Sequence, residues 1–217
     1  MTMRLFSFAL IPAALFTVAA RPHPRPAIPV ARAAADTLRL AVAPDGNEAR
    51  YRAREQLAHV DLPNDAVGAT NSVTGLIVLD GQGHLVPGAS KISVDVRPLK
   101  SDRSYRDRYV QGRILETGTY PTVDFVPTSA AGLPAVLPAT GDFAFTVTGD
   151  LTVRGTTHPV TWDVTARTVP GGFTGSASTK FTFADFALSK PNVPIVLSVA
   201  DTIKLEYDFH LVPAASK

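Results

Sequence analysis

The strongest constraint on the fold of this chain is a strict alternation of apolar and polar residues. From 143 to 153 it is clearest, where Phe143, Phe145 and Val147 alternate with alanine and threonine. Successive side chains of a β-strand point to opposite faces, so such a segment has one apolar face and one wet face. The pattern recurs over residues 38–42, 92–96, 160–167 and 203–211. The sequence therefore predicts an antiparallel sheet that buries one face.

Further strands are expected over residues 49–57, 72–79, 122–126 and 173–183, separated by turn signals such as Asp45-Gly46 and Gly171-Gly172. This gives eight or nine strands. They can stack as a sandwich or close into a barrel, and closure removes exposed edges. Periodicity does not decide between the two. An eight-stranded barrel is either filled by its own side chains or holds one small ligand.

One segment departs from the alternation and predicts a short helix over residues 101–115. Tyr105, Tyr109 and Gly112 share one helical face. Ser101 or Ser104 is a suitable N-cap, and Gly118 a suitable stop.

Residues 1–20 have the features of a secretory signal peptide. Arg4 precedes an uncharged run that ends in small residues at Ala20. The run is shorter than the roughly 20 residues needed to cross a bilayer, so we expect no stable membrane span. Residues 21–35, rich in Pro, Ala and Arg, are expected to be a linker, and residues 36–217 the folded domain. A secreted or periplasmic location follows as an expectation.

The composition excludes several classes of function. The formal net charge of +2 becomes −2 when the four arginines before residue 36 are left out, so we expect no nucleic-acid partner. The chain has no cysteine, which excludes disulfides and thiolate metal sites. Isolated histidines stand at His59, His84, His158 and His210. With no nucleophile elbow and no nucleotide-binding motif, we expect no catalytic residue, no metal, no cofactor and no enzymatic activity.

Two groups of arginines stand out. The first consists of Arg50, Arg52 and Arg54, on one face of an expected strand, where a solvated outer surface is the simplest interpretation. The second consists of Arg103, Arg106 and Arg108, near the start of the expected helix. These form either a charged surface paired with Asp102 and Asp107 or an anion-binding headgroup site at the mouth of a barrel.

Several short motifs follow one another in a characteristic order. They are Val73-Thr74-Gly75, Val96-Arg97-Pro98-Leu99, Ser101-Asp102, Arg106-Asp107, Tyr120-Pro121, Val123-Asp124-Phe125, the segment Gly149 to Gly155, Pro159-Val160, and the segment Phe183 to Pro191. In this combination the chain resembles the YceI family of exported lipocalin-like proteins, over essentially all of residues 37–212. The motifs look like determinants of the fold more than ligands of a headgroup. Residues 133–138 and the first arginine group are departures from the family pattern.

The resemblance implies an all-β protein, an antiparallel eight-stranded lipocalin-like barrel with one short helix. It also implies a long polyisoprenoid lipid in the lumen and no established enzymatic activity. Candidate ligand-binding residues are the alternating apolar side chains Phe143, Phe145, Val147, Trp162, Val164, Phe181, Phe183, Leu205, Tyr207 and Phe209. An ordinary filled core would use the same residues.

The expected function is that of an exported protein that sequesters or carries a long-chain isoprenoid of the polyprenyl or quinone type. Burial of the tail should set affinity, and the second arginine group should choose the headgroup. Two alternatives remain open: an enzyme of the same barrel type that acts on a small apolar substrate, and a module that engages another envelope protein.

Overall fold

The computed structural model describes residues 37–58 and 60–214. The expected signal peptide (residues 1–20) and linker (residues 21–35) lie outside these residues, as does His59.

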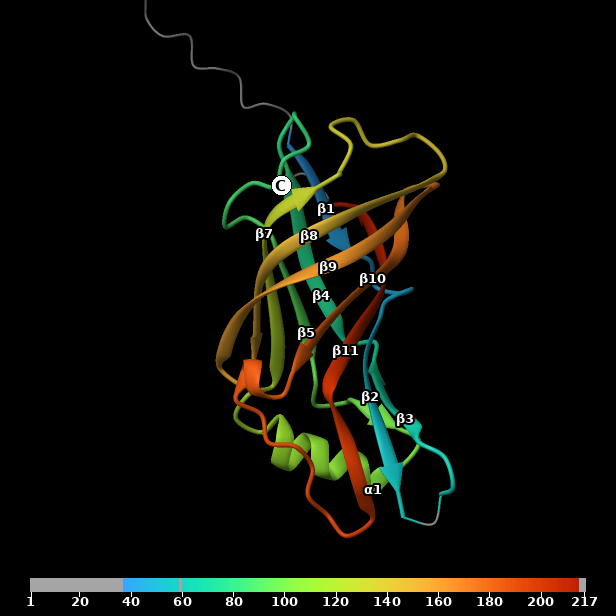
Figure 1. The fold of residues 1–217 in the computed structure, drawn as a ribbon. Coiled ribbons are helices and arrows are strands. Elements are labelled where there is room, and N and C mark those ends of the chain that lie inside the picture. The colour runs from blue at the N-terminus through green and yellow to red at the C-terminus, as the bar shows by residue number, and fades with distance from the viewer. Residues whose placement is uncertain (1–36, 59, 215–217) are drawn as a thin grey trace, which may run out of the picture. The chain divides into compact units, whose positions relative to one another are not determined.

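The described residues form a closed antiparallel barrel of eight long strands with one short helix, which confirms the predicted fold class (Figure 1). Five of the long strands are continuous: β7 (Thr122–Ala131), β8 (Asp142–Val153), β9 (Thr156–Val169), β10 (Gly172–Thr182) and β11 (Val196–Pro213). The other three are interrupted. They are β1 (Leu38–Val42) with β2 (Glu48–Leu57), β3 (Asn64–Thr70) with β4 (Val73–Leu79), and β5 (Lys91–Asp95) with β6 (Lys100–Ser101).

Each long strand pairs with its neighbour in the sequence, and the ring closes between the first and the last. The long β11 pairs with β1 at Leu211↔Val42 and continues along β2 from Asp208↔Glu48. Likewise β3 pairs with β2 and β6, while β4 pairs with β1 and β5. Closure therefore pairs both outer edges of the sheet and leaves no long edge strand exposed among the described residues, which is the advantage expected of a barrel.

Strand β3 was absent from the sequence prediction. Its residues are small or polar, and Gly68 occupies an inward position where a large apolar residue would have signalled a strand. A Cβ at Gly68 would lie 2.3 Å from Cε1 of Tyr51, so the glycine makes room for the neighbouring ring. The sequence of β3 lacks the alternation of large apolar residues because this close approach requires glycine at position 68.

The helix is shorter than predicted. Residues 100–101 form β6, so α1 runs from Ser104 to Tyr109 and continues as a π-helical turn, η1, over Val110–Ile114. Arg103 occupies the N-cap without a side-chain hydrogen bond, so the expected serine cap is wrong, and the turn ends before Gly118. In Figure 1, α1 lies at the end of the barrel opposite the C-terminus.

A compact core packs on one side of the barrel, between β8, β9, β10 and the turn that follows β10. Phe186, in the 3₁₀ turn η2 (Ala184–Phe186), is fully buried, and its ring lies 4.6 Å from that of Phe181. Leu151 and Leu188 are buried in the same cluster. The turn η2 therefore closes the space between these strands.

Three of the family-like motifs meet in space at the glycines of the segment Gly149 to Gly155. The β8–β9 turn has positive φ at both Arg154 and Gly155, as a two-residue hairpin turn requires. A Cβ at Gly155 would lie 3.0 Å from the ring of Tyr120, and one at Gly149 would lie 2.7 Å from the ring of Phe125. The structure thus supports the interpretation of these motifs as determinants of the fold.

Candidate functional site

The inward faces of the strands enclose a cavity of about 580 Å³, called the lumen below. An engineered apolar cavity of about 150 Å³ accommodates one benzene molecule. At the same density, the lumen holds about 23 carbon atoms. The interior of this barrel is therefore hollow enough for a substantial part of a lipid tail.

All ten residues predicted to bind the ligand line the lumen. They fall into two groups by burial. The packed group, less than 10% exposed, is Trp162, Val164, Phe181, Phe183 and Phe209. The partly exposed group is Phe143, Phe145, Val147, Leu205 and Tyr207. The first group belongs to the buried core and forms the wall, whereas the second packs against that core and borders open space. Their role in binding stays a prediction.

Aromatic rings border the open part of the lumen. Phe143 stacks on Phe145 with ring centroids 5.8 Å apart, and Phe173 meets Phe143 edge-on at 6.2 Å. The segment between β7 and β8 lies at the end of the barrel opposite α1 (Figure 1). Leu133 and Leu137 of this segment also line the lumen. The segment 133–138, unexpected from the family pattern, thus contributes apolar lining.

Side chains that both line the lumen and reach solvent mark its mouth, which lies at the α1 end. Tyr105 is 38% exposed and Ile195 is 41% exposed, and both line the lumen. The Ala58 N–H donates to the Ile195 carbonyl at 2.9 Å, which fastens the β2–β3 turn to the segment before β11. Exposed apolar side chains gather on these two connections and at the start of β11: Val60, Leu62, Ile195 and Leu197, called the apolar rim. Sequence reasoning missed the mouth because loops carry no periodic signal.

A buried ion pair also borders the lumen. Arg106 Nη2 donates to Glu55 Oε1 at 2.5 Å, and the two side chains are only 9% and 7% exposed. Arg106 Nη1 donates to Asp102 Oδ1. Burial opposes the charge on Arg106, but the adjacent Glu55 and Asp102 outweigh it and hold the pKa of Arg106 above its ordinary value.

Of the three predicted headgroup residues, the structure brings only Arg106 to the lumen, while Arg103 and Arg108 do not line it. The expectation that Arg106 forms an exposed charged surface with Asp102 needs correction, because Arg106 is buried and pairs with Glu55 as well. Sequence reasoning also missed Glu55. The sequence did contain a signal for Glu55. In the alternation along β2, Glu55 falls on the same inward face as Tyr51 and Ala53, and the arginines fall on the other face.

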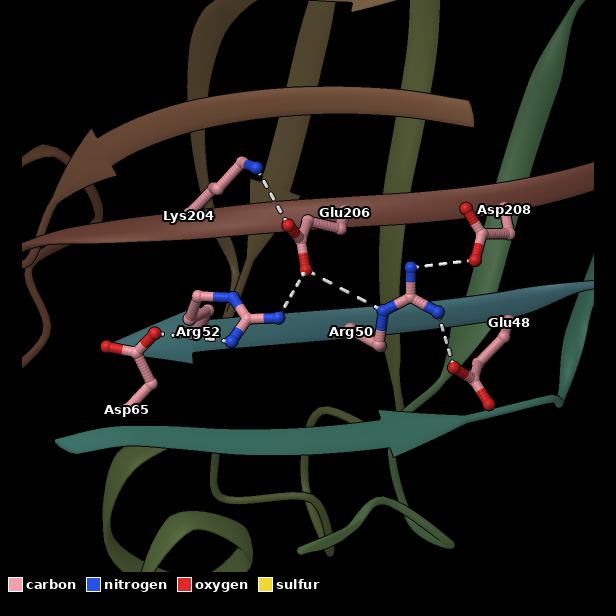
Figure 2. Close-up of polar contacts among 7 residues, drawn as sticks. All are labelled: Glu48, Arg50, Arg52, Asp65, Lys204, Glu206 and Asp208. Atoms are coloured by element: carbon pink, nitrogen blue, oxygen red, sulfur yellow. Dashed lines mark hydrogen bonds and ion pairs between the residues drawn. The ribbon is translucent and has the colours of Figure 1, made fainter. Parts of the chain in front are cut away.

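The first arginine group lies on the opposite face of β2, where it takes part in an ion-pair network, and Figure 2 shows Arg50 and Arg52 with their partners. Arg50 and Arg52 are less solvated than predicted, whereas Arg54 is exposed as predicted. Arg50 pairs with Asp208 at 2.7 Å, and Arg52 pairs with Glu206 at 3.3 Å. Arg54 pairs with Asp65 at 3.2 Å. Hydrogen bonding from Lys204, with the charge of Arg52, lowers the pKa of Glu206. The network links β2 to β3 and β11 and leaves its arginines neutralised.

Within residues 37–58 and 60–214, no three histidines or carboxylates gather closely enough to hold a metal ion. No helix in this described part is long and apolar enough to cross a membrane.

Comparison with known proteins decides the family. The sequence model for the YceI-like domain matches residues 42–211. The chain belongs to the YceI-like family. This confirms the family that the motifs indicated.

A UPF0312 protein of Pseudomonas putida is 42% identical over 82 residues, which cover 36% of this chain and 39% of the relative. The match thus spans about two fifths of the length of such curated relatives.

Solved structures of the YceI-like type share the fold at low identity. A structure described as a polyisoprenoid-binding domain from Saccharophagus degradans implicated in plant cell wall breakdown is 12% identical, with a TM-score of 0.62. The alignment covers 82% of this chain and 99% of that one. BcnA of Burkholderia cenocepacia is 20% identical with a TM-score of 0.58, over 80% of this chain and 99% of its own.

Proposed function

We propose that this protein binds a long-chain isoprenoid lipid of the polyprenyl or quinone type, with the tail inside the lumen. The observation that carries the proposal is a hollow apolar interior of about 580 Å³ that opens beside an apolar rim. Membership of the YceI-like family, and a structural neighbour described as polyisoprenoid-binding, support the choice of lipid.

The size of the lumen is sufficient for tight binding. Burial of hydrocarbon contributes about 0.8 kcal/mol per methylene, so about 23 buried carbons give about 18 kcal/mol before costs. Loss of translational freedom and ordering of the tail offset part of this sum. A single neutral hydrogen bond adds only about 1 kcal/mol. The tail therefore sets affinity, and a chain longer than the lumen leaves its remainder at the mouth.

The chemistry of the lumen favours binding over catalysis. Glu55 and Arg106, the ionisable pair at its α1 end, already neutralise each other and hydrogen-bond within the protein. A general acid must release a proton and a general base must accept one, and both steps are disfavoured for a guanidinium and a carboxylate that stabilise each other's charge in a buried ion pair. We accordingly propose a carrier or sequestering protein, acting outside the cytoplasm on the strength of the signal-like residues 1–20.

The test is mass spectrometry of lipid extracted from the protein after mild purification from its own cells. A single class of prenyl lipid, near one molecule per chain, is the expected result. The matched control is the variant Phe145→Arg, which places a charge in the lumen. Wild-type protein that carries no prenyl lipid and takes none up from added vesicles would contradict the proposal.

A further inference from the structure

One group of polar side chains borders the lumen at its mouth. Glu55 and Arg106 border the lumen there together with Tyr105 and Tyr51. Burial raises the pKa of Tyr51 to about 12, while the positive charge of Arg106 nearby counteracts this in part. The Tyr51 phenol therefore stays protonated near neutral pH and can donate a hydrogen bond beside the ion pair. A lipid with its tail in the lumen would place its headgroup among these side chains.

The charge of this cluster is unsuited to an anion. Both terminal nitrogens of Arg106 are engaged, one by Glu55 and the other by Asp102. The next carboxylate, Asp107, accepts hydrogen bonds from the backbone N–H and the hydroxyl of Ser101 at 2.8 and 2.6 Å. Two cations, Arg106 and Arg103, which lies 3.5 Å from Asp102, are thus set among three carboxylates, and a phosphate would still meet net negative charge.

A phosphate could reach the guanidinium only by displacing a carboxylate. Displacing Glu55 would leave a side chain that is 7% exposed without its counterion, which is strongly unfavourable. Displacing Asp102, which is 65% exposed, would free only Nη1, and the Glu55 carboxylate on Nη2 would still repel the phosphate. An uncharged headgroup requires no displacement. Its oxygen can accept from the Tyr51 hydroxyl, and a hydroxyl group can donate to the Glu55 carboxylate.

We infer that the cluster Tyr51, Glu55 and Arg106 selects an uncharged, oxygen-bearing headgroup, an alcohol or a quinone, and discriminates against phosphorylated prenyl lipids. This inference rests on the proposed function and specifies its ligand. Arg106 then acts as a positioning residue that holds Glu55 at the mouth, and the charged arginine itself is not a phosphate ligand.

The experiment compares two probes with one tail, geranylgeraniol and geranylgeranyl monophosphate, through the fluorescence of Trp162. Trp162 is the single tryptophan of the chain and lines the lumen, so its emission reports occupancy directly. Wild-type protein should bind the alcohol more tightly by about tenfold or more. In Glu55→Gln, Arg106 loses its buried partner, and the preference should shift toward the phosphate by about tenfold.

Two further variants make the result specific. Asp65→Asn removes an ion-paired carboxylate on β3, outside the lumen, and should leave the ratio of affinities unchanged. Tyr51→Phe removes only a hydroxyl and should weaken the alcohol about fivefold with little effect on the phosphate. This variant decides the matter if Glu55→Gln does not fold.

Equal or tighter binding of the phosphate by the wild type would overturn the inference. So would an unchanged ratio in folded Glu55→Gln, or in Tyr51→Phe where that variant has to decide. Failure of both probes to bind would instead contradict the proposed lipid-binding function, and the two failures are thereby distinguishable.

Discussion

A substitution that adds a large side chain inside the lumen distinguishes a hollow barrel from one with a packed core. Ala177 lies on β10, lines the lumen and pairs with Val164 and Tyr207 across the neighbouring strands. The substitution Ala177→Phe adds a phenyl ring the size of benzene, so it fills about 150 Å³ of the lumen's 580 Å³. It therefore displaces about six tail carbons, with a gross loss of about 5 kcal/mol in binding free energy.

Part of that loss is recovered because the tail can retreat toward the mouth. We expect a net loss of about 2.7 kcal/mol, which weakens binding about a hundredfold. The free energy of unfolding should be unchanged or higher, since the ring buries apolar area in empty space. In a filled core the same substitution would cost about 1 to 3 kcal/mol of stability through overpacking.

The assay is a titration with geranylgeraniol followed by Trp162 fluorescence, alongside urea unfolding of the same samples. The matched control is Ala144→Phe, at an exposed position of β8, which should change neither affinity nor stability appreciably. Undiminished affinity in Ala177→Phe, or lost stability together with retained affinity, would refute the assignment of the lumen as the binding site.

Three other perturbations test the fold, the ion-pair network and the mouth. Gly149→Ala puts a Cβ 2.4 Å from a backbone oxygen of β7 and should lower the free energy of unfolding in urea by about 2 to 4 kcal/mol. In the control Gly118→Ala the new Cβ meets nothing within 4 Å, and equal stabilities of the two variants would contradict the packing argument. The folded pKa of Glu206 lies below its unfolded value of about 4.3, so its contribution is complete above about pH 5 and lost as pH falls through the folded pKa. Glu206→Gln should thus lower stability by about 1 kcal/mol at neutral pH and by less in acid. If the difference in unfolding free energy between the variant and the wild type does not depend on pH, the ionised Glu206 carboxylate does not stabilise the fold. Ile195→Asp should slow prenol transfer from vesicles about tenfold relative to Ser198→Asp, and equal transfer rates would place the mouth elsewhere.

Strand positions were predictable from the sequence wherever inward residues are large. The alternation around Phe143, Trp162 and Tyr207 located β8, β9 and β11, because one face of each strand borders the apolar interior. The same reasoning failed for β3, where Gly68 yields its space to the ring of Tyr51. Closure into a barrel depends on the pairing of β11 with β1 and β2. The paired residues are about 140 to 170 positions apart in the sequence, and no local pattern specifies such a pairing.

The polar part of the candidate site was predictable only in part. Arg106 was identified as a candidate, but its burial in α1 depends on Glu55, which lies 51 residues away on strand β2. An acidic residue in phase with the inward side chains of β2 was the available signal. Similarly, the apolar composition predicted a core, but the division into a packed wall and an open lumen depends on how η2 places Phe186.

The position of a bound tail shows directly whether the lumen is the lipid-binding site. A crystal structure with a prenol brominated along its tail would locate the bromine atoms by anomalous scattering. We predict peaks inside the barrel, bordered by Phe145, Leu205 and Tyr207, with the hydroxyl at the α1 end. Bromine confined to the outer surface, or a lumen closed by its own side chains, would contradict the account.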